Sequence, residues 1–286
     1  MFRSLLRNWL HGAAKHKLRE KAVEAAEEHV RATAETARGV GEIRPCDLGI
    51  VFALGIESGG LEDRLSEVTN IRGEGFVVRQ GVLHERNITL IRSGAGREKA
   101  ATATEALIDG HRPGWVLSAG FAGGLRPELK RNDILMADHV ADTAGGRLAI
   151  DLKVDTDSLA KMPEVHVGRL LSTDRVIRLP GEKRTLGGEH GAMAVDMETF
   201  AVAEVCRRRE VRFLAVRVVI DTVDEELPPD VEHLLSQKTV PGKLGAATGS
   251  LWRRPSSLKD MYRLRENALV ASEQLAKFLD GMVEQL

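Results

Sequence analysis

Residues 47–54, DLGIVFAL, form a short apolar run that is typical of a buried β-strand. A helix is predicted after it, over residues 57–68. Strand-like and helix-like segments then alternate through most of the remaining chain. This alternation predicts an α/β fold, in which a single domain has a central twisted mixed β-sheet flanked by helices.

The later segments extend the pattern. A hairpin is predicted from strands at 76–83 and 87–92, and further strands at 115–119, 133–140, 165–172 and 212–220. Helices are predicted at 97–110, 197–209 and 259–286. Residues 228–255 are expected to form a loop with one short helix.

The composition is that of a soluble globular protein. The chain has 286 residues, 43% hydrophobic and 29% charged, with a formal net charge of −1. These values exclude disordered, collagenous and disulfide-rich classes. A balanced charge also argues against nucleic-acid binding, which needs a basic surface. Because no apolar run reaches about 20 residues and no signal-peptide pattern is present, a cytoplasmic protein is expected.

No metal site is expected. Cys46 and Cys206 lie outside any CxxC or Cys/His cluster, and the nine histidines show no HxH or HExxH spacing. The cysteines are interpreted as small buried residues of a reducing compartment.

Residues 1–45 are predicted to form an amphipathic helical extension to a main domain at 46–286. Residues 1–21 hold six basic residues against one acid, Glu20. Such a helix can lie on an anionic membrane surface, or it can pack against its own domain or a partner subunit. Both interpretations stay open. Apolar residues recur at helical spacing along one face: Phe2, Leu5, Leu6, Trp9, Leu10 and Ala13.

Acidic residues and glycines follow several predicted strands. Glu57 follows the first strand, the turn GFAGG (120–124) follows another, Glu198 ends the segment VDME, and Asp221 ends the strand at 212–220. In open α/β sheets, ligands bind beyond the carboxyl ends of the strands. Each acid alone is more often a helix cap or a solvated loop residue. Together they predict a site with three carboxylates and a close approach of the backbone.

The turn SGAG (93–96) follows a strand and opens a helix, a position that suits an anion. It lacks the third glycine of a dinucleotide-binding fingerprint, and no acid ends a strand about 20 positions further on. The chain also has no GxxxxGK[ST] and no GxSxG motif. A dinucleotide cofactor is therefore not expected.

Taken in order, these segments resemble the nucleoside phosphorylase/nucleosidase superfamily, which includes methylthioadenosine/S-adenosylhomocysteine nucleosidases and purine nucleoside phosphorylases. The resemblance covers residues 47–224 and is carried by GIV (49–51) with Glu57, SGAG (93–96), GFAGGL (120–125), AVDME (194–198) and VRVVID (216–221). It implies that 46–286 is a catalytic domain. Further on, LPP (227–229) and LWRRP (251–255) resemble the tails of hopanoid-associated phosphorylases.

The resemblance implies a role for each acid. Cleavage of a ribose–purine bond builds positive charge on the sugar and negative charge on the base. An acid must therefore protonate the base, and carboxylates must hold the sugar. Asp221 matches the residue that delivers a proton to purine N7, which a desolvated pocket favours. Glu198 matches the carboxylate that accepts hydrogen bonds from the ribose 2′- and 3′-hydroxyls, and Glu57 the base that activates water.

Other matched positions are expected to bind the substrate. Met197 packs under the sugar, and Val176 and Ile177 line the purine pocket. Arg217 either orients Glu198 or forms an ordinary ion pair at the end of its strand. The remaining expected binding residues are Ser93, Gly120 and Phe121.

The chain departs from the family pattern at three positions. Phe121 and Ile220 stand where the nucleosidases have serine, and Ser118 replaces the arginine with which bacterial purine phosphorylases bind phosphate. Loss of this arginine removes a bidentate phosphate clamp, so hydrolysis led by Glu57 is favoured over phosphorolysis. No cofactor is expected, and inorganic phosphate stays open as a co-substrate.

The main expectation is a purine nucleosidase that hydrolyses an adenine nucleoside with an apolar 5′ substituent and releases the free base. One alternative is phosphorolysis of a lipid-linked adenosine of the adenosylhopane type, with residues 1–21 in peripheral contact with a membrane. Another is a non-catalytic nucleoside-binding protein on the same fold. The resemblance also implies a homo-oligomer.

Overall fold

The computed structural model describes residues 45–72, 76–152, 161–229, 231 and 255–285, with the backbone alone for 255–265. The described residues belong to one compact unit that runs from Pro45 to Leu286. Residues 1–44 of the extension predicted at 1–45, and most of the loop predicted at 228–255, lie outside the described residues. No helix in the described part of the chain is long and apolar enough to cross a membrane.

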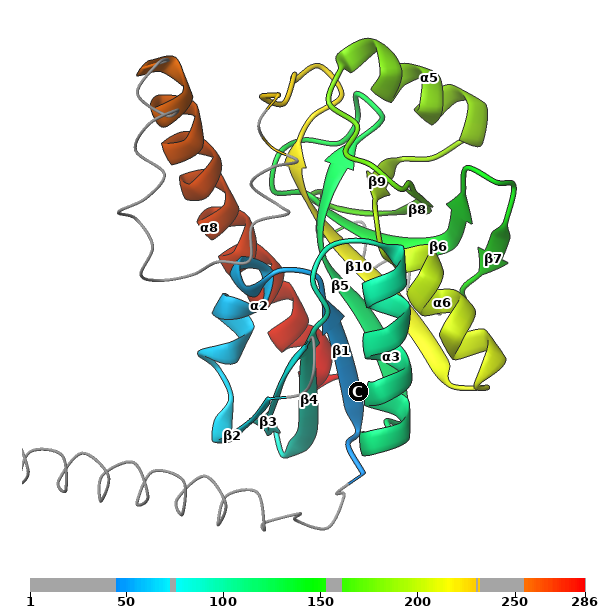
Figure 1. Ribbon diagram of the computed structural model, residues 1–286, viewed down its shortest axis with the longest axis vertical. Helices are drawn as coiled ribbons and strands as arrows, with labels where there is room; N and C mark the ends of the chain where they lie inside the picture. Colours follow the sequence, from blue (N-terminus) through cyan, green and yellow to red (C-terminus); the bar gives the residue numbers. More distant parts are fainter. Residues whose placement is uncertain (1–44, 73–75, 153–160, 230, 232–254, 286) are drawn as a thin grey trace, which may run out of the picture. The chain divides into compact units, whose positions relative to one another are not determined.

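A mixed sheet forms the centre of the fold (Figure 1), as the sequence predicts. From β5 it extends through β1, β4, β3 and β2 to an edge. On the other side, β5 pairs with both β10 and β9, β10 pairs with β6, and β6 and β9 both pair with β8. These pairings form a closed ring of strands. The strands are β1 (Leu48–Phe52), β2 (Ser66–Arg72), β3 (Val77–Leu83), β4 (Arg86–Arg92), β5 (Trp115–Gly124), β6 (Ile134–Asp142), β7 (Arg147–Ala149), β8 (Val165–Ser172), β9 (Ala194–Asp196) and β10 (Arg212–Asp221).

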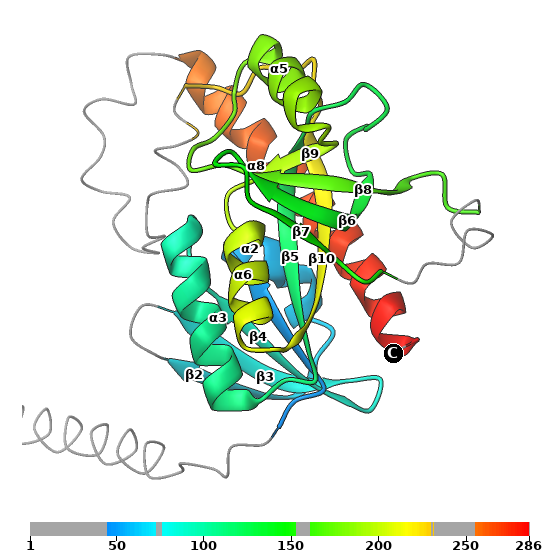
Figure 2. The same ribbon diagram turned by 90° about the vertical axis from the view of Figure 1, so that its right-hand side faces the viewer.

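Helices cover both faces of the sheet (Figures 1 and 2). On one face α2 (Gly55–Glu62) packs against α8 (Pro255–Glu284), and on the other α3 (Arg97–His111) packs against α6 (Thr199–Arg208). A further helix, α5 (Pro180–His190), lies beyond the ends of β5 and β10.

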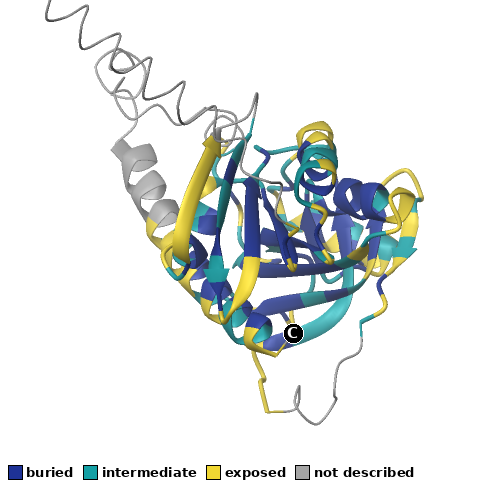
Figure 3. Ribbon diagram, turned by 90° about the horizontal axis from the view of Figure 1, so that it is seen from below, coloured by how far each residue is buried: buried dark blue, intermediate teal, exposed yellow. Residues whose placement is uncertain are grey.

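Strand β1 is buried on both faces because its side chains alternate between two apolar clusters. Ile50 and Phe52 belong to the cluster that includes Leu275 of α8. Val51 belongs to the cluster that includes Leu107 of α3. Figure 3 shows that buried residues run through the central strands of the sheet.

Several predicted elements are confirmed. The hairpin of β3 and β4 turns at His84 and Glu85, both of which have positive φ. Strand β8 has the predicted bounds, and α3 begins directly after the SGAG turn.

Other elements differ from the predictions. The helix predicted at 57–68 ends at Glu62, and the chain continues as β2, which pairs with β3. The β-branched residues Val68, Thr69 and Ile71 fit a strand better than a helix. The predicted turn at 120–124 is wrong as well, since these residues complete β5 because β10 runs alongside and pairs with them. The sequence did not predict α5, β7 or β9.

Candidate functional site

Strand ends bring the predicted acids together. Strand β5 lies parallel to both β1 and β10, so the carboxyl ends of these strands meet at one edge of the sheet. Glu57 follows β1 in α2, and Asp221 ends β10. Glu198 stands at the N-cap of α6, directly after β9, which pairs with the end of β5.

Glu57 is held by the backbone. Its Oε2 accepts a hydrogen bond from the amide of Leu54 (2.7 Å), and its Oε1 accepts one from the amide of Phe121 (3.0 Å). A Cβ atom on Gly120 would lie 2.8 Å from Oε1, so only glycine leaves room for this carboxylate. Burial raises the pKa of Glu57, while the two amides and the charge of Arg217 act in the opposite direction.

Glu198 is bound by the SGAG turn. Its Oε1 accepts a hydrogen bond from the amide of Gly96 (2.7 Å), whose φ of 105° suits glycine. The group bound at this helix N-terminus is thus a side chain of the protein itself. Burial, together with the negative charges of Asp196 and Glu57, raises the pKa of Glu198 to about 8.

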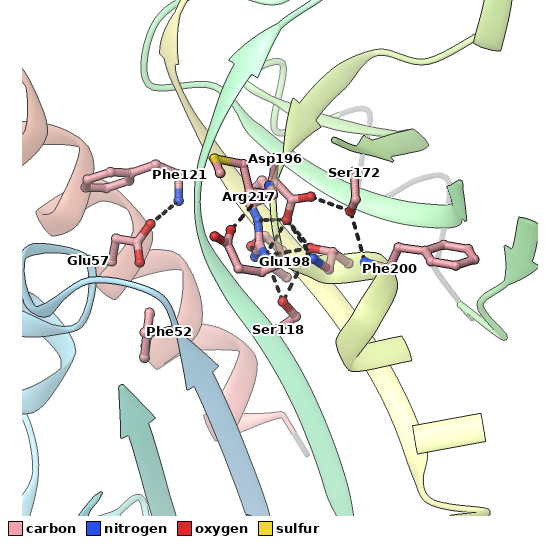
Figure 4. Close-up of polar contacts among 12 residues, drawn as sticks. Phe52, Glu57, Ser118, Phe121, Ser172, Asp196, Glu198, Phe200 and Arg217 are labelled. Carbon is pink, nitrogen blue, oxygen red and sulfur yellow. Dashed lines mark hydrogen bonds and ion pairs between the residues drawn. The ribbon is translucent and has the colours of Figure 1, made fainter. Parts of the chain in front are cut away.

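Of the two roles expected for Arg217, its contacts are those of an ion pair, and the partner is Asp196. Its guanidinium donates to Asp196 Oδ2 from Nε (3.0 Å) and from a terminal nitrogen (2.8 Å). It also donates to the hydroxyls of Ser118 (2.7 Å) and Thr199 (2.5 Å). Both charged groups of this pair are almost fully buried. Figure 4 shows the network beside Glu198, where the charge of Arg217 acts to lower the pKa of Glu198.

Asp196 is a residue of this network that sequence reasoning missed. It also accepts hydrogen bonds from the Ser172 hydroxyl (2.6 Å) and from the amide of Thr199 (3.0 Å). Its position in the VDME segment was a signal, but the spacing alone could not show which of the two acids pairs with Arg217.

Asp221 lies beside a second missed residue, Lys183. The Lys183 ammonium, which is fully buried, donates to Asp221 Oδ2 at 2.5 Å. A Cβ atom on Gly123 would lie 3.1 Å from the same oxygen, so Asp221 packs closely on β5. No signal in the sequence pointed to Lys183, because the helix that carries it was itself not predicted.

The other predicted substrate-binding residues differ in their burial and contacts. The Ser93 hydroxyl has one proton to donate, and the carbonyls within its reach are those of Gly94 (2.8 Å) and Phe52 (3.3 Å), so it binds the local backbone. Ile177 is buried in a small apolar cluster with Leu171, whereas Val176 is half-buried. Met197, Glu198 and Phe121, which belong to the site itself, are half-buried.

Glu57, Glu198 and Asp221 thus gather at the glycine-rich end of β5, which is the candidate site for a small ligand. Among the described residues, no group of three or more His, Cys, Asp or Glu side chains could hold a metal ion. The chain belongs to the phosphorylase superfamily, whose family model matches residues 47–244.

Two curated relatives have the same name. The chain is 28% identical over 210 residues to the 5′-methylthioadenosine/S-adenosylhomocysteine nucleosidase of Tolumonas auensis, covering 66% of this chain and 91% of that protein. It is also 28% identical over 214 residues to the enzyme of that name from Staphylococcus aureus strain Newman, covering 68% and 94%.

Solved structures share the fold. The Helicobacter pylori 5′-methylthioadenosine/S-adenosylhomocysteine nucleosidase with butyl-thio-DADMe-Immucillin-A matches with a TM-score of 0.66 and 22% identity, covering 86% of this chain and 100% of that one. The Neisseria meningitidis enzyme of that name, in complex with methylthio-immucillin-A, has a TM-score of 0.64 and 23% identity, covering 84% and 99%. Futalosine hydrolase of Helicobacter pylori has a TM-score of 0.63 and 22% identity, covering 85% and 99%.

Proposed function

We propose that this protein is a purine nucleosidase that hydrolyses the N-glycosidic bond of an adenine nucleoside and releases the free base. Membership of the phosphorylase superfamily and the names of the curated relatives support this activity. The observation that carries the proposal is the position of Glu57, a buried carboxylate that two backbone amides hold against Gly120.

The proposed reaction begins with the leaving base. Asp221 gives a proton to N7 of the purine as the bond between C1′ and N9 breaks and its electron pair moves to the base. The ribosyl group becomes positively charged, and Glu198 stabilises it through hydrogen bonds from the 2′- and 3′-hydroxyls. Met197 packs against the sugar, and Val176 and Ile177 lie on the side of the base.

Glu57 completes the reaction. It takes a proton from a water molecule, whose oxygen then forms a bond to C1′. Burial favours this role because a desolvated carboxylate with a raised pKa is a stronger base than one in water.

Water is favoured over phosphate because Ser118 stands where the related purine phosphorylases have their phosphate-binding arginine. Arg217, which reaches Ser118, is already paired with Asp196 and buried. A phosphate would also have to approach Glu57, which acts as a carboxylate in the proposed reaction, and like charges repel one another strongly in a desolvated site.

Incubation with 5′-methylthioadenosine, S-adenosylhomocysteine and adenosine tests the proposal, with and without phosphate. Chromatography should detect adenine together with a free sugar at a rate that does not depend on phosphate. A sugar 1-phosphate would show phosphorolysis instead. Absence of adenine from all three nucleosides would contradict the proposed function.

Two further proposals concern partners. The protein is expected to bind a small purine nucleoside and to form a homo-oligomer, which sedimentation velocity would measure. Peripheral membrane contact through residues 1–21 concerns residues outside the described part of the chain. In flotation with anionic liposomes, the full chain should float with the liposomes and a chain that starts at Pro45 should not. Equal behaviour of the two chains would contradict this contact.

A further inference from the structure

Lys183 makes a saturated set of hydrogen bonds next to the proposed proton donor. Its ammonium donates to Asp221 Oδ2 (2.5 Å) and to the carbonyls of Glu225 (2.7 Å) and Thr222 (2.9 Å). An ammonium has three N–H groups and no acceptor, so these partners use all of its donors. The side chain is fully buried.

The two oxygens of Asp221 are in different situations. Oδ2 accepts the hydrogen bond from Lys183 and lies next to Gly123. The other oxygen, Oδ1, accepts no hydrogen bond from the described residues. This oxygen is not fully buried. One oxygen is thus fixed and the other is left for a ligand.

From this arrangement we infer that Lys183 is a positioning residue for Asp221, which holds one carboxylate oxygen so that the other faces the leaving base. The inference rests on the proposed function, and it adds a residue from α5 to the site. Helix α5 is itself tightly placed, since a Cβ atom on Gly187 would lie 2.7 Å from the carbonyl oxygen of Leu125, directly after β5. Lys183 therefore has a defined position relative to the end of that strand.

The charges around Asp221 set the direction of its pH dependence. Burial raises the pKa of Asp221, the Lys183 ammonium lowers it, Glu225 raises it and Arg131 lowers it. Arg131 and Glu225 also pair with each other, at 2.5 Å. Removal of the Lys183 charge is therefore expected to raise the pKa of Asp221, which would then stay protonated to a higher pH.

The test is a double-mutant cycle of Lys183→Met and Asp221→Asn, with adenine release from 5′-methylthioadenosine measured as a function of pH. Lys183→Met should lower kcat at least about tenfold and move the basic limb of kcat/KM up by about one pH unit or more. In the Asp221→Asn background, Lys183→Met should cost almost nothing, because Lys183 acts through Asp221. The matched control is Arg184→Met, which removes an exposed cation from the same helix and should leave the profile unchanged.

An equal loss in both backgrounds, or an unmoved basic limb, would overturn the inference. If Lys183→Met does not fold, Lys183→Gln keeps an N–H donor without the charge, and its basic limb should shift in the same direction. If the wild type releases no adenine from any nucleoside, the proposed function fails on its own. The inference is then judged by calorimetry with adenine. The pH dependence of adenine affinity should differ between Lys183→Met and the wild type, and an unchanged pH dependence would overturn the inference.

Discussion

The carboxylate of Glu57 lies so close to the backbone of Gly120 that a Cβ atom on residue 120 would stand 2.8 Å from its Oε1. This contact joins α2 to β5 and places Glu57 where it also accepts the amide of Phe121. The absence of a side chain at Gly120 therefore lets the buried carboxylate of Glu57 lie directly against the strand.

Gly120→Ala should displace Glu57 from the Phe121 amide. We expect a loss in kcat of at least about tenfold, and a loss of roughly 1–3 kcal/mol in the free energy of unfolding from overpacking. Gly59→Ala is the control, since it lies in the same helix as Glu57 and its Cβ would meet no atom within 4 Å. That variant should keep full activity. Steady-state kinetics and urea denaturation measure both effects, and equal kinetics for the two variants would contradict the steric explanation.

Glu57→Gln should remove the proposed base while keeping the size of the side chain. General-base catalysis contributes roughly 10²–10⁴-fold, so kcat should fall by that factor with little change in nucleoside affinity. Glu273→Gln, at an exposed acid of α8 that pairs with Arg64, should be neutral. Adenine release and calorimetric binding provide the two readouts. A Glu57→Gln enzyme with undiminished kcat would show that water is activated elsewhere.

The raised pKa of Glu198, about 8 against an ordinary value of 4.5, predicts how stability depends on pH. The folded state binds a proton more tightly than the unfolded state, so this contribution to stability is complete below pH 4.5 and is lost as the pH rises through about 8. The slope should not exceed about 1.4 kcal/mol per pH unit.

Denaturant unfolding at a series of pH values measures this effect. Glu198→Gln cannot titrate, so its free energy of unfolding should vary less between pH 5 and 8 than that of the wild type. Parallel curves for the two proteins would mean that Glu198 is ionised throughout this range.

Arg217→Met should be strongly destabilising, because it leaves Asp196 as a buried carboxylate without its cation. Breaking a buried pair in this way costs roughly 3–5 kcal/mol. Adding Asp196→Asn should recover part of the loss, since the double variant has no unpaired charge. Urea denaturation of the single and double variants tests this coupling, and simple additivity of the two losses would refute it.

Parts of the fold and the site could be predicted from local patterns. The apolar run of β1 and the turn of the β3–β4 hairpin depend on neighbouring residues, so they are visible in the sequence. Helix α5 was not predicted because its sequence, PGEKRTLGGEH, has glycines at helical positions and no apolar stripe. It is held by contacts with distant segments, such as Gly187 against Leu125 and Lys183 against Asp221.

The sequence by itself determined that Glu57 and Asp221 follow strands of an α/β fold and that Glu198 precedes a helix, because apolar runs and helix starts are local patterns. Only the tertiary structure decided the partners of these acids. Arg217 pairs with Asp196 and Asp221 with Lys183, although 21 and 38 residues separate the members of these pairs in the chain. Strand register and burial decide such pairings, and the same burial sets the protonation of Glu198, since desolvation acts only after the chain has folded.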